Sequence, residues 1–166
     1  MYGWMIVGLM GVLPIGSILA EWLLFPGGAG AAALVPLVGK WFVFWAAGVR
    51  LFLAGLRQIA DPAFTAQTIF RIADPGAGVI VQELGFANVA IGILGIVSFL
   101  HGAWIVPAAL AGCVFLGLAG GRHVLNANRT RTETIALVSD LWIAAVLAAF
   151  LVATLVAPGL GPGRPA

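Results

Sequence analysis

The stretch TIALVSDLWIAAVLAAFLVATLVA, residues 134–157, decides the fold, because Asp140 is the only charged side chain in it. A helix needs about 20 predominantly apolar residues to cross the hydrocarbon core of a bilayer. Backbone groups in lipid find no water, so they must close their hydrogen bonds within the segment, as a helix does. The stretch therefore predicts a transmembrane helix.

Four earlier stretches have the same character, and together they set the fold class. The 166-residue chain is 62% hydrophobic and 8% charged, whereas soluble domains carry roughly a quarter charged residues. We predict an all-α integral membrane bundle of about five transmembrane helices. The expected organisation is an N-terminal helix and loop over 1–35, retained because no basic residues precede its apolar run, a four-helix membrane domain over 36–157, and a disordered tail over 158–166. The four further helices are expected at 2–24, 36–57, 83–101 and 104–121.

The segment between the second and third stretches is more polar and repeats the phrase Asp-Pro, at Asp61-Pro62 and Asp74-Pro75. Asp can cap a helix while Pro takes its first position, so each phrase predicts a helix start. Apolar residues recur between the two phrases at helical spacing. They predict a short helix that either lies along the membrane interface or connects and packs on the bundle.

Basic residues in the short loops predict the orientation. Five crossings place one group of arginines on a single side, and cytoplasmic loops carry the excess of Lys and Arg. The amino terminus is then cytoplasmic and the carboxyl terminus outside. The larger group is Arg57, Arg71, Arg122, Arg129 and Arg131, and the smaller one is Lys40 and Arg164.

Arg50 is the charge that most needs a partner, because it lies seven residues before Arg57 inside an apolar helix. This puts it roughly 10 Å below the cytoplasmic interface, where an unpaired charge costs about 3 kcal/mol or more. Asp140 lies at a matching depth, and Glu83 and Asn88 enter from the same side. We predict that Arg50 pairs with Asp140 or Glu83 and that Asn88 completes the hydrogen bonds. Such a cluster can bind a ligand, or it can only fix helix packing.

The remaining polar side chains give weaker signals. His101 and His123 are about 33 Å apart along one helix, so they cannot share a metal ion. His123, beside Arg122, could hold an anionic headgroup or a quinone carbonyl. Glu21 is expected to reach water or headgroups, and Cys113 to be an inert core residue.

Small residues form a stripe along the third stretch, at Gly85, Asn88, Gly92 and Gly95. Faces of this kind let helices approach closely. In the first stretch, Pro14 predicts a kink.

Several function classes lack their usual residues. The chain has one cysteine and shows no phosphate-binding loop and no Ser/His/Asp grouping, so we predict no catalytic residue and no metal ligand. Whether it is an enzyme stays uncertain, with the balance against it. A net charge of +2 without a basic cluster argues against nucleic acid as a partner.

Two phrases, FWAAGVRLFLAGLRQIADPAFTAQTIFRI (44–72) and QELGFANVAIGILGIVS (82–98), resemble an uncharacterised family of small bacterial integral membrane proteins, a domain of unknown function. The resemblance covers roughly residues 36–157. The layout is similar to the DoxX-like four-helix membrane proteins, with Arg50, Ala54-Gly55, a polar connector and Glu83 in the corresponding places. It implies a bacterial inner-membrane location. Members of that wider group are linked to quinol-oxidising complexes and to assembly of membrane proteins.

Two functional hypotheses follow. The first is a non-catalytic accessory or assembly subunit of a membrane complex, for example a redox complex. Such a subunit contacts other membrane subunits or its own copies within the lipid bilayer. The alternative is a small carrier or a lipid- or quinone-binding protein, with a polar inner-leaflet pocket formed by Arg50, Asn88, His123 and Asp140. Lipid and quinone both remain open as ligands.

Overall fold

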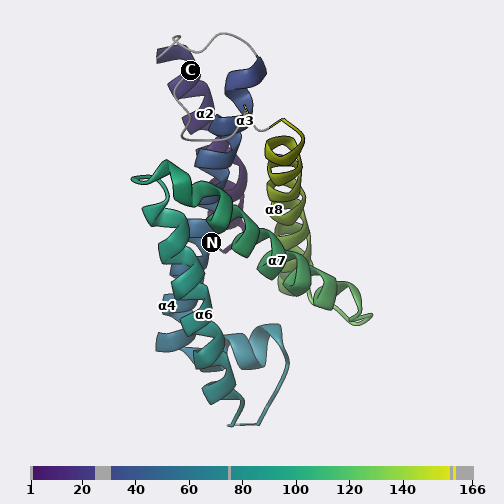
Figure 1. Cartoon of the computed structure of the whole chain (residues 1–166). Helices are drawn as coiled ribbons and strands as arrows, with labels where there is room; N and C mark the ends of the chain where they lie inside the picture. The colour runs from purple at the N-terminus through teal and green to yellow at the C-terminus, as the bar shows by residue number, and fades with distance from the viewer. Residues whose placement is uncertain (1, 25–30, 75, 158, 160–166) are drawn as a thin grey trace.

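The structure of the chain, a computed structural model, describes residues 2–24, 31–74, 76–157 and 159, without the side chains of residues 2, 3 and 31–33. This part is all-α, and five of its helical segments are long and apolar enough to cross a membrane (Figure 1). The predicted fold class is therefore confirmed. Nearly all of the tail expected to be disordered lies outside the described residues. The five segments are Trp4–Leu24, Leu34–Ala60, Ala77–Val97, Gly102–Val124 and Arg131–Val156.

Several segments combine α-helix with short π-helical stretches, here labelled η. The first comprises α1 (Tyr2–Val7), η1 (Gly8–Val12) and α2 (Leu13–Leu24), and the second comprises α3 (Ala31–Trp41), η2 (Phe42–Val49) and α4 (Arg50–Ala60). The connector holds α5 (Pro62–Phe64) and the π-helical η3 (Thr65–Ile69). The rest are α6 (Ala77–Val97), the 3₁₀ turn η4 (Gly102–Trp104), α7 (Ile105–Val124) and α8 (Arg131–Val156).

The first Asp-Pro phrase starts a helix as predicted, because Asp61 Oδ1 accepts the N–H of Phe64 at 3.3 Å. At the second phrase Asp74 Oδ1 accepts the N–H of Gly76 at 2.7 Å, and α6 begins at Ala77. The third membrane helix thus starts at Ala77, whereas the sequence analysis expected it to start at Glu83. Gln82 and Glu83 interrupt the apolar run in the second turn of α6, so a reading based on hydropathy began the helix at Glu83.

Pro14 explains how the first segment joins the bundle. Proline has no N–H, so it cannot bond the carbonyl four residues earlier, which belongs to Met10. That carbonyl instead accepts the indole N–H of Trp142, from α8, at 3.3 Å. The π-helix η1 ends at Val12, two residues before Pro14, and the kink expected at Pro14 stays a prediction. The hydrogen bond to Trp142 attaches the first segment to the last.

The glycine stripe of α6 packs against the second segment of the same chain. A Cβ atom on Gly95 would lie 2.7 Å from the Cα of Gly48, and one on Gly55 would lie 2.6 Å from the carbonyl oxygen of Gly85. Cβ atoms do not occur this close to backbone, so only glycine permits the contact. The small-residue face that we expected to meet a partner is therefore used inside the chain.

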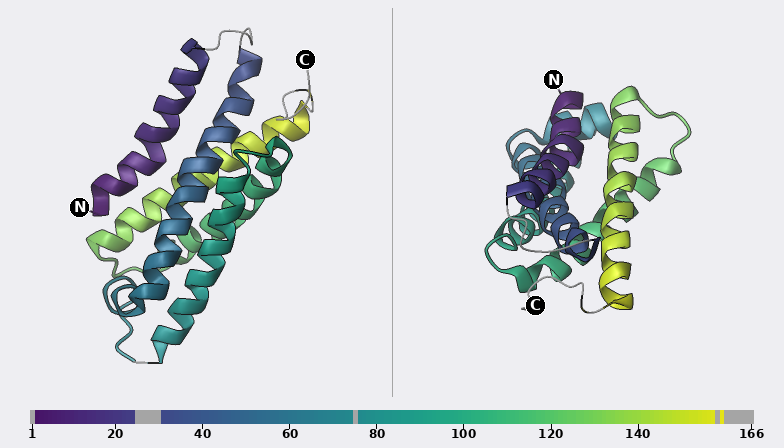
Figure 2. Two further views of the ribbon diagram at one scale, coloured as in Figure 1. Left: turned by 90° about the vertical axis from the view of Figure 1, so that its left-hand side faces the viewer. Right: turned by 90° about the horizontal axis from the view of Figure 1, so that it is seen from above.

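The four helices after the first segment form two hairpins (Figures 1 and 2). One pairs η2 and α4 with α6, and the other pairs α7 with α8. The hairpins meet where η2 contacts α7 and α8 and where Arg50, the first residue of α4, contacts α8. The rest of α4 packs mainly against α6. The ends of the hairpins near the α4–α6 connection and the α7–α8 turn diverge in both figures.

Candidate functional site

Arg50 and Asp140 join the two hairpins at the place where they begin to diverge. Arg50 Nη2 donates to Asp140 Oδ1, and to Ser139 Oγ at 3.3 Å. The two charged side chains are 9% and 8% exposed. The structure thus places Arg50 on Asp140, one of the two partners expected. Because α4 continues to Ala60, the pair lies about 15 Å from the end of that helix.

The pair leaves one strong donor without a protein partner. Nη1 of Arg50 is buried and makes no hydrogen bond to any described residue. Ser139 donates its own proton to the carbonyl of Ala136 at 2.8 Å, so it supplies Arg50 with an acceptor only. An unpaired charge-bearing N–H in the interior is costly. This N–H group can donate a hydrogen bond to an anion or to a carbonyl oxygen of a ligand.

Glu83 does not join this pair, and the prediction that it belongs to the cluster is wrong. The side of α6 that packs against the second segment carries Val81, Gly85 and Asn88, all of them buried. Glu83 lies two residues from both Val81 and Gly85, about 200° around the helix, and is exposed. Glu83 also follows Gln82, which bonds the carbonyl of Ile59, so it lies about nine residues along α4 from the level of Arg50. Its depth and its helical face both separate it from Arg50.

Asn88 is buried and bonded, but to a different residue from the one expected. Its Nδ2 donates to Gln58 Oε1 at 2.7 Å, while its Oδ1 is buried without a partner among the described residues. Gln82 Nε2 also donates to the carbonyl of Ile59 at 3.2 Å. These amides tie α6 to α4 and do not complete the hydrogen bonds of Arg50, as we had predicted for Asn88.

His123 belongs to a second buried network at the α7–α8 turn. Its Nδ1 lies 3.1 Å from Glu133 Oε1, which also accepts from Asn126 Nδ2 at 2.8 Å. The N–H of Glu133 donates to Thr130 Oγ1 at 3.0 Å. His123 is therefore paired with Glu133, whereas the sequence placed it in one pocket with Arg50.

Glu133 is the residue that the sequence analysis missed. The pattern Thr130-x-x-Glu133 is a capping-box signature and marks the start of α8. Recognising it would have moved the helix start from Thr134 to Arg131. It would also have placed Glu133 at the same membrane depth as His123.

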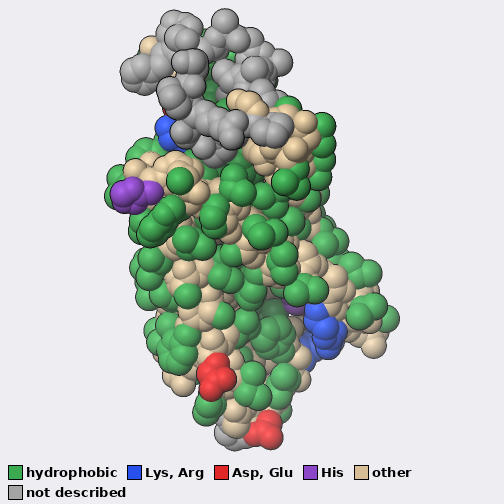
Figure 3. All heavy atoms as spheres, in the orientation of Figure 1, with side chains coloured by type: hydrophobic (Ala, Val, Ile, Leu, Met, Phe, Trp, Pro, Cys, Tyr) green, Lys and Arg blue, Asp and Glu red, His purple; other side chains and the backbone are tan. Residues whose placement is uncertain are grey.

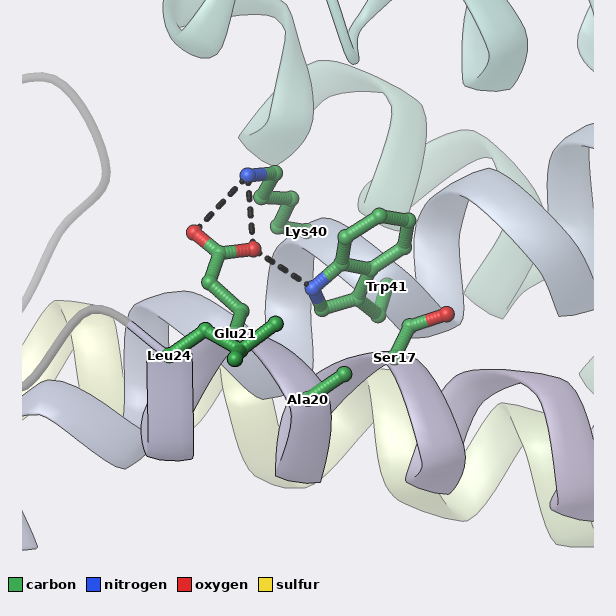
Figure 4. A pocket seen from close by; sticks show the side chains of 6 residues that line it. All are labelled: Ser17, Ala20, Glu21, Leu24, Lys40 and Trp41. Atoms are coloured by element: carbon green, nitrogen blue, oxygen red, sulfur yellow. Dashed lines mark hydrogen bonds and ion pairs between the residues drawn. The ribbon is translucent and has the colours of Figure 1, made fainter.

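Glu21 and Lys40 form a third polar group at the opposite end of the bundle (Figure 4). Lys40 Nζ donates to both carboxylate oxygens of Glu21 at 2.9 and 2.8 Å, and Trp41 Nε1 donates to one of them at 2.8 Å. Glu21 is thus paired within the chain, where we had expected contact with water or headgroups. The group borders a pocket of about 490 Å³ lined by Ser17, Ala20, Glu21, Leu24, Lys40 and Trp41.

The polar residues expected in one cluster therefore lie in three places: Arg50 with Asp140, Asn88 with Gln58, and His123 with Glu133. Within the described ranges, no three His, Cys, Asp or Glu side chains gather as a metal site would require. Comparisons with protein-family models, with curated proteins and with solved structures find no match. The resemblance to DoxX-like proteins stays a prediction, and the function must be inferred from the geometry of these groups.

Proposed function

We propose that this chain is a non-catalytic binding protein or carrier for an amphiphilic anion, and that Arg50 binds the head of the ligand. The observation that carries the proposal is the buried pair of Arg50 and Asp140 at the divergence of the hairpins, with Nη1 of Arg50 unpartnered. Ionisable residues within membrane helices commonly mark ligand or ion pathways.

The position of the pair favours a ligand that comes from the lipid. Arg50 lies within the second membrane segment and bonds α8, whereas the part of α4 that follows it packs mainly against α6. An amphiphile can place its chain along the apolar helices and its charged head on Nη1. Two separate charged residues would be costly in hydrocarbon, so the neutral pair is the stable resting state.

Charge balance predicts how the ligand would exchange with Asp140. If an anion replaces the carboxylate on Arg50, Asp140 is left as a buried charge without its partner. The ligand and the carboxylate of Asp140 therefore compete for the charge of Arg50.

A photoactivatable fatty acid carrying a diazirine group tests the proposal in proteoliposomes, with the corresponding fatty alcohol as the uncharged comparison. We expect the acid, and not the alcohol, to label peptides that contain Arg50 or Ser139. Arg50→Leu should reduce labelling roughly tenfold or more, the loss of one hydrogen bond to a charged group. Asp140→Asn should increase labelling, because it removes the internal competitor of the ligand.

The double variant Glu21→Gln/Lys40→Met is the matched control, since it neutralises the ion pair at the other end of the bundle. It should label like the unmodified chain. Labelling that is unchanged in Arg50→Leu contradicts the proposal, and so does labelling that falls in Asp140→Asn, because a purely structural pair predicts loss in both. If a quinone probe labels the site specifically and the fatty acid does not, the ligand is a quinone carbonyl and not an anion.

The accessory-subunit hypothesis has less support in the geometry. It was based on the glycine stripe of α6, which packs within the chain against Gly48 and Gly55. Copurification of a second protein in mild detergent, in fixed stoichiometry, is the result that would favour it over ligand binding.

For the location we propose a bacterial inner membrane, with the amino terminus and the α7–α8 turn on the cytoplasmic side. The support is the distribution of arginines, since cytoplasmic loops are enriched in Lys and Arg.

A further inference from the structure

The α7–α8 turn gathers positive charge on its surface. Arg122, Arg129 and Arg131 are all exposed there. Glu133, the acidic residue of this turn, is buried and paired with His123, so it faces the interior. With His123 neutral, the turn has a net charge of +2.

The α4–α6 connection, which five crossings place on the same side of the membrane, has the opposite balance. Arg57 and Arg71 are accompanied there by Asp61, Asp74 and Glu83, all exposed, for a net charge of −1. Figure 3 shows blue side chains on one lower lobe of the molecule and red ones on the other. Orientation alone requires only an excess of positive charge on this side. The concentration at one turn needs a further explanation.

The turn is also held in a fixed shape. Nη1 of Arg129 donates to the carbonyls of His123, Val124 and Asn126 at 3.0, 2.9 and 2.8 Å. These bonds neutralise the carbonyl end of α7, the negative end of its dipole. Because the turn is already ordered, binding a ligand to its arginines does not require the turn to change conformation.

Apolar side chains are exposed on the membrane side of the arginines. Leu118 is exposed on α7 about one turn before Arg122, and Val138 is exposed on α8 two turns after Arg131. A phosphate alone would contact only the arginines, whereas a phospholipid can contact both groups. We propose that the α7–α8 turn binds an anionic phospholipid, with Arg122 and Arg131 on its headgroup and its acyl chains along Leu118 and Val138. This surface is separate from Arg50 and does not depend on the proposed ligand there.

Native mass spectrometry tests this proposal, using the full chain in detergent with equal amounts of phosphatidylglycerol and phosphatidylcholine. We expect phosphatidylglycerol to be retained preferentially. Arg122→Gln/Arg131→Gln should reduce the preference on the order of tenfold or more, because each basic residue near an anionic lipid contributes to binding. Arg122→Lys/Arg131→Lys should keep most of it.

The variant Arg57→Gln/Arg71→Gln is the matched control, since it removes the same charge from the other connection on this side. It should keep the preference for phosphatidylglycerol. Equal losses in the two double Gln variants would overturn the proposal, as would no loss in Arg122→Gln/Arg131→Gln. Displacement of the lipid by millimolar inorganic phosphate would also overturn it, by showing a site for a soluble anion. If the double Gln variant does not fold, Arg131→Gln alone decides, with an expected loss of roughly fivefold.

Discussion

Arg50 shows how far depth along a helix can predict a contact. Its position inside an apolar stretch required an opposite charge at similar depth, and Asp140 supplies it. Glu83 enters the membrane from the same side, but it lies near the level of Ile59, nine residues along α4 from Arg50, and on the exposed side of α6. Hydropathy gives the depth of a residue, whereas the packed face depends on which helices become neighbours. The sequence could therefore narrow the choice to two acids but could not select one.

Substitutions at Arg50 and Asp140 should have strongly non-additive effects on stability. Leucine at either position leaves the other charge buried and unpaired, which should cost about 3–5 kcal/mol. The double variant Arg50→Leu/Asp140→Leu should cost far less, because no uncompensated charge remains. Thermal unfolding of the four proteins in lipid bicelles measures the coupling. If the losses in unfolding free energy of the two single variants simply add up in the double variant, Arg50 and Asp140 do not interact.

At the scale of helices, the glycines of α6 determine which segment it packs against. Gly95→Ala places a methyl group 2.7 Å from the Cα of Gly48, a backbone atom that cannot move aside independently. We expect a loss of about 1–3 kcal/mol in unfolding free energy. Gly11→Ala is the matched change, because a Cβ there meets nothing within 4 Å. Similar stabilities of the two variants would show that the close contact between η2 and α6 does not form.

The hydrogen bond between Trp142 and Met10 can be tested through Pro14. Trp142→Phe should destabilise the chain by about 1 kcal/mol, since it leaves the Met10 carbonyl without a donor. Pro14→Ala restores a backbone N–H that can bond this carbonyl. The effect of Trp142→Phe should therefore largely disappear in the Pro14→Ala background. Equal effects in both backgrounds, measured by thermal unfolding, would show that Pro14 is not the reason why the Met10 carbonyl lacks a backbone donor.

Element boundaries show where a reading of the sequence failed and why. The starts of α6 and α8 were each placed several residues late, because polar residues lower hydropathy without ending a helix. These are Gln82 and Glu83 in the second turn of α6, and residues 131–134 in the first turn of α8. At α8 a cap, Thr130 with Glu133, marks the true start. The glycine stripe of α6 was recognised from its spacing, but its partner was not, because spacing alone does not distinguish a segment of the same chain from another protein.

For the whole molecule, the five apolar stretches give the five membrane segments, but the lengths of their connections do not give the pairing. The helices α4 and α6 pair across the long connector, whereas α6 and α7, joined by the short connection, are not the principal partners of each other. The proposed orientation predicts where single cysteines react. In a Cys113→Ala background, Asn128→Cys in the α7–α8 turn should react with a membrane-impermeant maleimide only after the inner membrane is permeabilised. Ala103→Cys, in η4 at the opposite end, should react in intact spheroplasts. The reverse pattern would invert the orientation.

The central claim is that Arg50 and Asp140 are in direct contact inside the bilayer. Solid-state NMR of the chain in lipid bilayers, with ¹⁵N in the arginine guanidinium groups and ¹³C in the aspartate carboxyl groups, measures this contact by dipolar recoupling. We expect one strong coupling, for nitrogen and carbon within about 4 Å, that is lost in Arg50→Lys. If the spectrum of the unmodified chain matches that of Arg50→Lys, the guanidinium is remote from Asp140, and the account of the site is wrong.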